Sequence, residues 1–306
     1  MFEAMTQRLR IDFAYDGTDF HGWAKQPGLR TVQGEMEAAI SKILRVRDAE
    51  TPVYLVVAGR TDTGVHARHQ VCHLDIETTV LERAMGHLSA TPPAALCHRL
   101  RHVLPRDIAL HSVVEAPAGF DARFSALERT YVYRVCDDAA FLDPRMRDFV
   151  LQAKGALDER LLNRAAAMIV GLRDFGSFAT PNPGGTTIRE VKVARWARRS
   201  QAAVEYGVHP VGAGLLEFTI VADAFAHNMV RSLVGAQVQV GLGKKSLEWF
   251  AEKLVTPLRE GSTGPIAPQG LTLEYVSYPE AGLLGERAQA IRAKRTLPEE
   301  SAVARM

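Results

Sequence analysis

Alternating strand patterns occur in both halves of this chain, each with amphipathic or apolar helices nearby. Residues 8–15 (RLRIDFAY) and 215–222 (LLEFTIVA) alternate apolar and polar side chains, which predicts half-buried strands. Helices are predicted from Thr31 onward, over residues 157–170 and over residues 225–240, where apolar residues recur at helical spacing. Both halves therefore combine strands with helices through hairpin-like connections. The sequence predicts an α+β fold of two related domains.

Further strands and a loop complete the expected organisation. Residues 52–58 (PVYLVVA) form an apolar, β-branched run that predicts a central strand, and residues 70–77 (QVCHLDIE) predict another. Residues 129–135 and 270–278 are also expected to be strands, and residues 89–96 (SATPPAAL) a loop.

Domain boundaries follow from the change of pattern along the chain. We expect an N-terminal α+β domain over residues 1–110 and a C-terminal α+β domain over residues 111–284. Residues 285–306 are charged, alanine-rich and poor in large apolar side chains, so a weakly ordered tail is expected there.

Composition excludes some classes of protein. The chain has 306 residues, a hydrophobic fraction of 47% and a formal charge of +2, so any nucleic-acid surface must come from local clustering of charge. Its three widely spaced cysteines indicate a reducing compartment rather than a disulfide framework. No apolar run is long enough to span a bilayer, and the N-terminus lacks a signal-peptide core. A cytoplasmic protein without membrane contact is expected.

Residues 59–66 (GRTDTGVH) contain Asp-Thr-Gly, the tripeptide that carries the catalytic aspartate of aspartic proteases. Proteolysis needs two aspartates that share a proton, and the chain has no second Asp-Thr-Gly or Asp-Ser-Gly. In addition, the polar residues Arg60 and Thr61 precede Asp62, where a dimeric protease would have apolar residues. The local pattern leaves two interpretations of Asp62, a turn residue at a strand end or a functional carboxylate.

Other short motifs indicate structure rather than chemistry. Residues 174–176 (DFG) lack the catalytic and glycine-rich loops of kinases, and residues 241–246 (GLGKKS) follow a helix where a phosphate-binding loop would open one. A zinc site is conceivable where four potential ligands cluster: His66, His69, Cys72 and His73. However, a strand would place His69 and Cys72 on opposite faces, and a polar strand edge is the alternative.

Arg231 lies in the apolar helix predicted over residues 225–240. Four residues form a polar row along that helix: His227, Asn228, Arg231 and Gly235. A buried guanidinium requires an anionic partner, and a loop carboxylate at the interface of the two halves, such as Asp62, would serve. A carboxylate held by arginine stays ionised and becomes a positioned nucleophile or base. The alternative is an arginine that extends to the surface.

Basic and aromatic residues cluster in two segments. Residues 120–134 (FDARFSALERTYVYR) and 188–200 (IREVKVARWARRS) carry several arginines, and the first also holds Tyr131 and Tyr133. Arginine binds phosphate and aromatic rings stack on unpaired bases, which favours RNA as a ligand. A solvated strand face remains the alternative for each segment.

Six ordered blocks resemble the tRNA pseudouridine synthase A family over about residues 8–279. The blocks are YDGTDFHGW with TVQGEMEAAI, AGRTDTGVHARHQVCHLD, FDARFSALERTYVYRV, LRDFGSF, AFAHNMVRSLVG and APQGLTLEYVSYP. The resemblance implies two α+β domains with mainly antiparallel sheets, flanked by helices, and an active-site cleft between the domains. It also implies a homodimer that binds tRNA and isomerises uridine to pseudouridine at positions 38, 39 and 40 of the anticodon stem-loop. No cofactor or metal is implied.

The resemblance also assigns roles to individual residues. Asp62 matches the catalytic aspartate, Arg60 the arginine linked to extrusion of the target base, and Arg231 the arginine that pairs with the aspartate. Tyr131 matches the tyrosine that stacks on uracil, and Leu271 the apolar residue under the base. Tyr133 and His66 complete the expected substrate-binding residues.

Several residues depart from the family pattern. Thr63 stands where alanine is usual, Ala24 where glutamine is usual, and Asn228 where histidine is usual, while Arg68 and His69 replace a small residue and glycine. None of these changes removes a catalytic group. Two other functions are weighed against the synthase, an RNA-binding protein that has lost catalysis and a hydrolase that uses Asp62 as a base. The second lacks an evident oxyanion site or metal.

Overall fold

The computed structural model describes residues 5–46, 53–181, 184–202 and 209–290. Those residues contain ten strands and several helices. Most of the strand pairs are antiparallel, whereas β6 (Leu151–Gln152) runs parallel to β5 (Glu128–Cys136). This content confirms the predicted α+β class. Contacts group the chain into two compact units, and each is described by itself.

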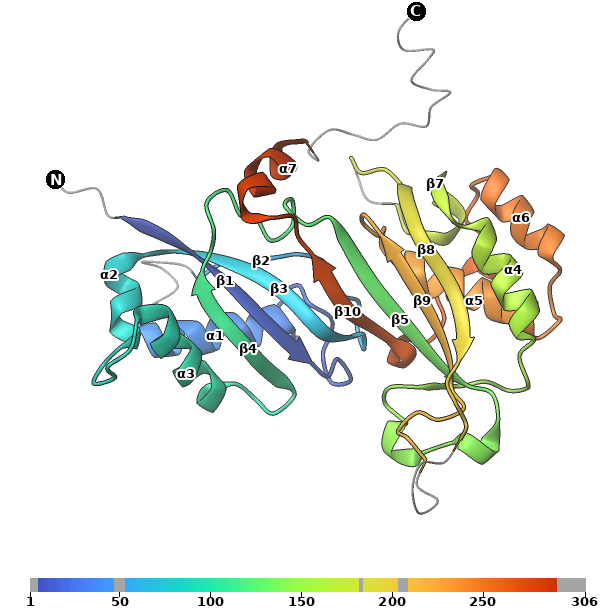
Figure 1. Ribbon diagram of the computed structural model, residues 1–306, viewed down its shortest axis with the longest axis horizontal. Helices are drawn as coiled ribbons and strands as arrows, with labels where there is room; N and C mark the ends of the chain where they lie inside the picture. The colour runs from blue at the N-terminus through green and yellow to red at the C-terminus, as the bar shows by residue number, and fades with distance from the viewer. Residues whose placement is uncertain (1–4, 47–52, 182–183, 203–208, 291–306) are drawn as a thin grey trace, which may run out of the picture. The chain divides into compact units, whose positions relative to one another are not determined.

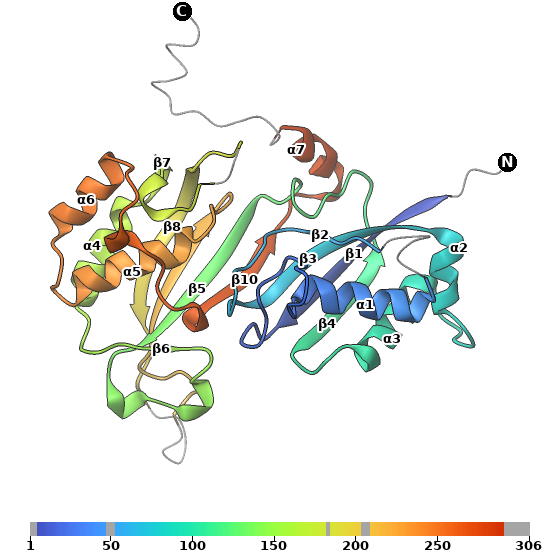
Figure 2. The ribbon, with the colours of Figure 1, turned by 180° about the vertical axis from the view of Figure 1, so that it is seen from behind.

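Unit 1 comprises residues 1–127 and 273–292. Its strand order is β4 (Ile108–Glu115), β1 (Thr6–Tyr15), β3 (His66–Glu77) and β10 (Leu271–Ser277), with the short β2 (Val56–Val57) also paired to β3. Figures 1 and 2 show α1 (Val32–Leu44) and α3 (Pro92–Val103) on the same face of this sheet. Two short helices, α2 (Thr78–Leu81) and α7 (Leu284–Ala290), complete the unit.

Among the described residues, unit 2 comprises residues 128–272. Its strand order is β5, β9 (Leu216–Ala222), β8 (Ile188–Arg198) and β7 (Gly171–Asp174). Figure 1 shows its helices behind the sheet and Figure 2 shows them in front, so they cover one face: α4 (Glu159–Met168), α5 (Met229–Gly241) and α6 (Leu247–Val255).

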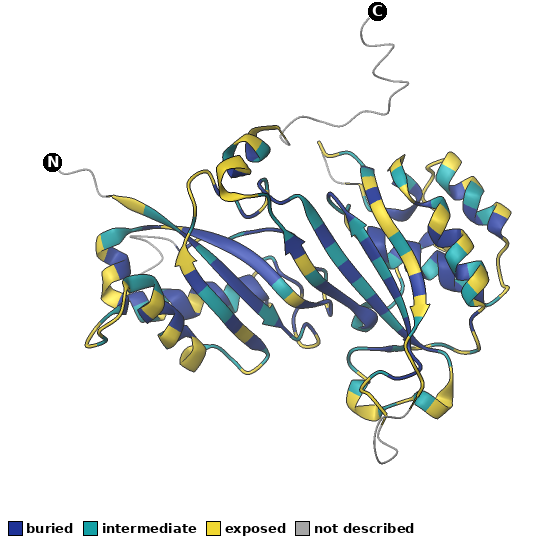
Figure 3. Cartoon of the chain, viewed as in Figure 1, coloured by how far each residue is buried: buried dark blue, intermediate teal, exposed yellow. Residues whose placement is uncertain are grey.

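The alternating patterns produce the buried faces of both sheets. On β1, Leu9, Ile11 and Phe13 are fully buried, and on β9, Phe218 and Ile220 are fully buried. Figure 3 shows this alternation along the strands of unit 2. Burial of such side chains contributes about 1.5–3 kcal/mol each, so these rows hold the helices to the sheets.

Three expectations about elements are wrong. The segment predicted as a central strand over residues 52–58 contributes only Val56–Val57, which pair with β3. The loop expected over residues 89–96 instead contains the start of α3, because Pro92 occupies the first helical turn, where the missing N–H is not needed. The helix expected from residue 225 begins at Met229, since the His227 carbonyl is paired with the Thr180 N–H.

The boundaries of the units differ from those expected at residues 110 and 284. Strand β4 pairs with β1 across Ile108 to Glu115, so these residues belong to the sheet of unit 1. Residues 284–290 form helix α7, where a weakly ordered tail was expected from residue 285. Residues 291–306 lie outside the described part of the chain.

A buried carboxylate lies on the sheet of unit 1. Asp12 accepts hydrogen bonds from Arg10 at 2.9 and 2.7 Å and from Ser112 at 3.2 Å, and its Oδ1 lies 3.1 Å from His69 Nε2. Burial alone raises the pKa of Asp12, but the hydrogen bonds from His69 and Arg10 and the charge of Arg10 hold that pKa at about 2.

This pKa predicts a loss of stability in acid. Because the folded pKa lies below the unfolded value, ionised Asp12 contributes about 2 kcal/mol above pH 4, and this contribution disappears as the pH falls toward 2. Asp12→Asn should therefore be less stable than the wild type at pH 6 and should lose less stability between pH 5 and pH 2. Denaturant unfolding at each pH measures both. Equal pH slopes for the two proteins would contradict the assignment.

Candidate active site

Asp62 lies in a tight turn between β2 and β3. The Val65 N–H donates to the Asp62 carbonyl at 3.1 Å, and Gly64 adopts a φ of 75°, which a residue with a side chain rarely takes. The Gly64 N–H donates to the Phe20 carbonyl at 3.2 Å, which ties the turn to a neighbouring segment. Asp62 is half-buried and Thr63 is exposed. The turn therefore presents the carboxylate from a fixed backbone.

A network of buried side chains supports this turn. The Tyr15 hydroxyl and the Thr61 hydroxyl are 2.8 Å apart, and Gln70 Nε2 donates to the Gly59 carbonyl at 2.9 Å and to the Tyr15 hydroxyl at 3.3 Å. Burial raises the pKa of Tyr15 to about 12, so its hydroxyl keeps its proton near neutral pH. The network fixes the residues on both sides of Arg60 to the ends of β1 and β3.

The segment 16–23 packs against the same turn. The Trp23 N–H donates to the Thr61 carbonyl at 3.0 Å, and the Trp23 ring is buried. Gly17 lies so close to the Val65 carbonyl that a side chain on it would overlap that oxygen. Close backbone approach of this kind requires glycine. The YDGTDFHGW block therefore packs directly against the Asp62 turn.

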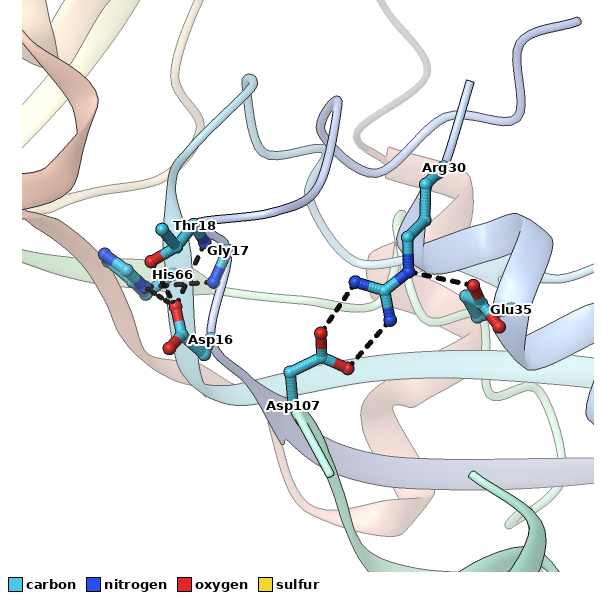
Figure 4. A network of polar contacts seen from close by, with 7 residues as sticks. All are labelled: Asp16, Gly17, Thr18, Arg30, Glu35, His66 and Asp107. Carbon is cyan, nitrogen blue, oxygen red and sulfur yellow. Dashed lines mark hydrogen bonds and ion pairs between the residues drawn. The ribbon is translucent and has the colours of Figure 1, made fainter. Parts of the chain in front are cut away.

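His66 ends the turn and faces this segment, as Figure 4 shows. Its Nδ1 lies 3.0 Å from the Gly17 N–H and 3.1 Å from Asp16 Oδ1, an oxygen that also accepts from the Thr18 N–H and hydroxyl. A neutral Nδ1 accepts from Gly17, whereas a protonated Nδ1 donates to Asp16. His66 is buried, so its contacts fix the backbone after Asp62.

Arg30, which follows the segment 16–23 in the chain, anchors this region through hydrogen bonds. Figure 4 shows Arg30 donating to both oxygens of Asp107, at 2.7 and 3.0 Å, and to Glu35 at 3.0 Å. The Arg30 guanidinium also lies 4.2 Å from the centre of the Phe20 ring. These bonds join the segment to the start of β4 and to α1.

Unit 2 contains the other expected site residues. Tyr131 and Tyr133 lie on the buried face of β5, and the Tyr131 ring packs edge-on against Phe225 with centroids 5.1 Å apart. The Tyr133 hydroxyl donates to the Ala267 carbonyl at 2.7 Å, and burial raises the pKa of this hydroxyl, which keeps it a donor.

Arg231 lies in the first turn of α5 and is half-buried. Its Nε donates to the Ile266 carbonyl at 2.7 Å, and the Ile266 N–H donates back to the Arg231 carbonyl at 3.2 Å. Shortly after Ala267, the buried Leu271 begins β10. Segment 266–271 thus gathers Tyr133, Arg231 and Leu271. Of the polar row predicted along the helix, Asn228 is the N-cap residue and accepts from Arg231 Nη1 at 3.5 Å, whereas His227 precedes the helix.

The potential zinc ligands are engaged elsewhere. His73 Nδ1 accepts from the Ala122 N–H at 3.0 Å, His69 lies against Asp12 and stacks on Tyr275, and Cys72 is buried. Among the described residues, no group of three or more histidines, cysteines or carboxylates is placed to hold a metal ion. In the same part of the chain, no helix is long and apolar enough to cross a bilayer.

Comparison with known proteins decides the family. A family model described as tRNA pseudouridine synthase matches residues 13–125 and 165–279. The chain belongs to the tRNA pseudouridine synthase family. It is therefore an isomerase that acts on tRNA. Asp62, Arg231 and Leu271 lie within the matched residues, whereas Tyr131 and Tyr133 lie in the interval between them.

Curated relatives agree along almost the whole chain. Proteins named tRNA pseudouridine synthase A from Bifidobacterium longum (strain NCC 2705) and Bifidobacterium animalis subsp. lactis are 61% and 59% identical, covering 95% of this chain and 99% of each relative. A protein of the same name from Streptomyces avermitilis is 43% identical, covering 95% of both chains.

Tyr15, Gln70 and Trp23 were not singled out as site residues from the sequence. Their roles depend on contacts between segments far apart in the chain. A polar Gln70 in the apolar pattern of a strand was the available signal, since a buried amide must have hydrogen-bond partners.

Tyr15→Phe is expected to loosen the Asp62 turn in this synthase. Loss of the hydroxyl leaves Thr61 and Gln70 without one partner each, which should lower the free energy of unfolding by about 1–3 kcal/mol. Pseudouridine formation in tRNA should fall about tenfold or more, because small displacements of a reacting group are costly. Tyr54→Phe, at an exposed tyrosine, is the matched control and should change neither quantity. Wild-type turnover in Tyr15→Phe would show that the network is not needed.

Proposed function

We propose that this synthase converts uridine to pseudouridine at positions 38, 39 and 40 of the tRNA anticodon stem-loop, with Asp62 as the catalytic group. The observation that carries the proposal is the Asp62 turn, a half-buried carboxylate on a backbone fixed by Tyr15, Gln70 and segment 16–23. Similarity to proteins named tRNA pseudouridine synthase A supports tRNA as the substrate, and the choice of positions rests on the resemblance of the six sequence blocks.

The reaction conserves every atom of the nucleotide. The bond between C1′ and N1 breaks, the uracil turns, and C5 bonds to C1′. The C5 proton leaves to solvent while N1 gains one. No electrons enter or leave, so the chemistry needs no redox cofactor. The protein must extrude the base, hold the freed uracil and supply one group that assists cleavage of the glycosidic bond.

Asp62 is suited to the last task. Its carboxylate can attack C1′, add to C6 or remove the C2′ proton, and each route needs an ionised, positioned oxygen. A fixed turn meets this need because little reorganisation precedes the reaction. His66 is buried at the end of the turn, and we propose that it preserves the conformation of the turn when the substrate binds.

Arg60 is proposed to occupy the space that the target base leaves. It is exposed and lies between Gly59 and Thr61, both of which are held by the Tyr15 and Gln70 network. An exposed guanidinium on a fixed backbone can enter an RNA stack and contact phosphate.

Tyr131 and Leu271 are proposed to hold the uracil between them by stacking and apolar contact. Both side chains are buried, which lowers the cost of sequestering a base beside them. Tyr133 is proposed to support this pocket, since its hydroxyl fixes the segment that leads to Leu271. Tyr131 is also able to assist deprotonation at C5.

Arg231 is proposed to pair with Asp62. Its Nε donates to the Ile266 carbonyl and its Nη1 donates to Asn228 Oδ1 at 3.5 Å, which orient a guanidinium group of the kind that binds carboxylates. The pair would keep Asp62 ionised in a site from which the substrate excludes water. We further propose that the enzyme acts as a cytoplasmic homodimer, which sedimentation analysis can test.

Asp62→Asn tests the catalytic assignment. With tRNA labelled with tritium at uracil C5, the wild type should release tritium, and the variant should release at least about a thousandfold less while binding tRNA normally. Asp19→Asn, an exposed aspartate in the neighbouring segment, is the control and should retain activity. Residual turnover in Asp62→Asn above background would refute the role of Asp62. Binding without release by the wild type would favour a non-catalytic RNA-binding protein.

Arg231 variants test the ion pair. Arg231→Gln keeps a donor for the Ile266 carbonyl but loses the charge, whereas Arg231→Lys keeps the charge. Turnover should fall about a hundredfold or more in Arg231→Gln and less in Arg231→Lys, with both proteins folded by circular dichroism. Equal activity of the glutamine variant and the wild type would show that the pairing with Asp62 is wrong.

A further inference from the structure

We propose that the exposed face of α3 binds the phosphodiester backbone of the tRNA. Residues 83–106 contain four arginines, three histidines and no acidic residue, although the whole chain has a formal charge of only +2. Within α3, His98, Arg101 and His102 are exposed and share one face by their spacing. Arg106 follows the helix and is also exposed. These four residues define the basic face of α3.

The charge of this face is not neutralised by the protein. Arg101 donates to the carbonyls of Leu110 and His111, and neighbouring Arg99 donates to the Met85 carbonyl at 3.4 Å. In the described part of the chain, neither Arg101 nor Arg106 has a carboxylate within ion-pair distance. Asp107, the nearest acidic residue in sequence, is held by both nitrogens of Arg30 (Figure 4). The face thus retains its positive charge.

Several other basic side chains of this chain are paired with carboxylates. Arg8 contacts Asp75 at 2.6 Å, Arg145 contacts Asp143 at 2.6 Å, and Arg198 contacts Asp137 at 2.7 Å. The basic segment 188–200, which the sequence favoured as an RNA-binding candidate, also pairs Lys192 with Glu128. Charges that are already paired offer less to a polyanion, whereas the face of α3 offers unneutralised guanidinium groups.

The basic face leads to the end of the sheet where Asp62 lies. Strand β4 follows α3 and begins at Ile108, which pairs with Tyr15 at the end of β1, and Tyr15 pairs in turn with Ala67 at the start of β3. Adjacent strands lie about 4.8 Å apart, so this end of α3 is within a few strand spacings of the turn. The Asp16 N–H donates to the Asp107 carbonyl at 2.9 Å, which fixes this arrangement.

A continuous RNA strand can therefore contact both features of unit 1. Phosphates along α3 would position the RNA while the target base enters the site at Asp62. Contacts of this kind carry no sequence information, so the face would contribute affinity and orientation rather than the choice of uridine. The proposal rests on the proposed function for the identity of the reacting base, but tRNA binding can be measured without turnover.

The test replaces two arginines that do not touch the Asp62 turn. Arg101→Gln/Arg106→Gln should weaken binding of unmodified tRNA, and the slope of log K against log salt should become shallower by about 1–2 units. In turnover, the loss should appear in KM rather than in kcat. Arg101→Lys/Arg106→Lys should restore the slope, because a phosphate contact requires charge rather than the shape of guanidinium.

The control removes the same charge elsewhere. Arg145 and Arg147 are exposed and each is paired with an adjacent or nearby aspartate, so Arg145→Gln/Arg147→Gln should leave the salt slope unchanged. An unchanged slope in the folded Arg101→Gln/Arg106→Gln protein would overturn the proposal, as would an equal change in the control. If the slope becomes shallower in Arg101→Gln/Arg106→Gln but the wild type forms no pseudouridine, the RNA-binding role of α3 stands and the proposed function is refuted instead.

Discussion

The buried hydrogen bonds among Tyr15, Thr61 and Gln70 are the interaction on which the Asp62 turn depends. They join a loop to the ends of β1 and β3, whose register places Tyr15 opposite Ala67. Because a buried hydroxyl or amide without a partner costs about 1–3 kcal/mol, the three side chains hold one another in place. The buried apolar residues of β1 and the buried Trp23 ring also hold this end of β1 in place. The geometry of the Asp62 turn and the packing of the core are thus parts of one arrangement in unit 1.

Periodicity predicted the elements that bury one face. Strands β1 and β9 alternate cleanly, and Thr31 caps α1 by accepting from the Gly34 N–H, so their sequences carry sufficient local information. Helix α3 was missed because its first turn contains two prolines, which are breakers inside a helix but suit its first turn. The boundary near residue 110 was misplaced because pairing between β4 and β1 is a long-range contact that no local pattern encodes.

The candidate site residues also divide into those that local sequence patterns mark and those that depend on long-range contacts. Asp62, Arg60 and Arg231 are predicted as site residues because motif blocks and an unusual charge in an apolar helix mark them in the sequence. The supporting contacts were not found, since the bond from Arg231 to the Ile266 carbonyl and the close approach of Gly17 to Val65 exist only after folding. Every residue has a backbone carbonyl, so the sequence does not mark which carbonyl accepts a hydrogen bond from arginine. A search for acidic partners therefore cannot identify such an acceptor.

The interrupted course of the chain through unit 1 has a consequence for synthesis. Unit 2 is continuous over residues 128–272, so all its strands have left the ribosome before β10 is complete. Unit 1 still lacks β10 and α7 at that point, and its sheet stays open at β3 until residues 273–292 emerge. Domains generally fold as units during synthesis. The unit that carries Asp62 is therefore completed last, although most of it is made first. A chain truncated before residue 273 would contain all of unit 2 but an incomplete sheet in unit 1.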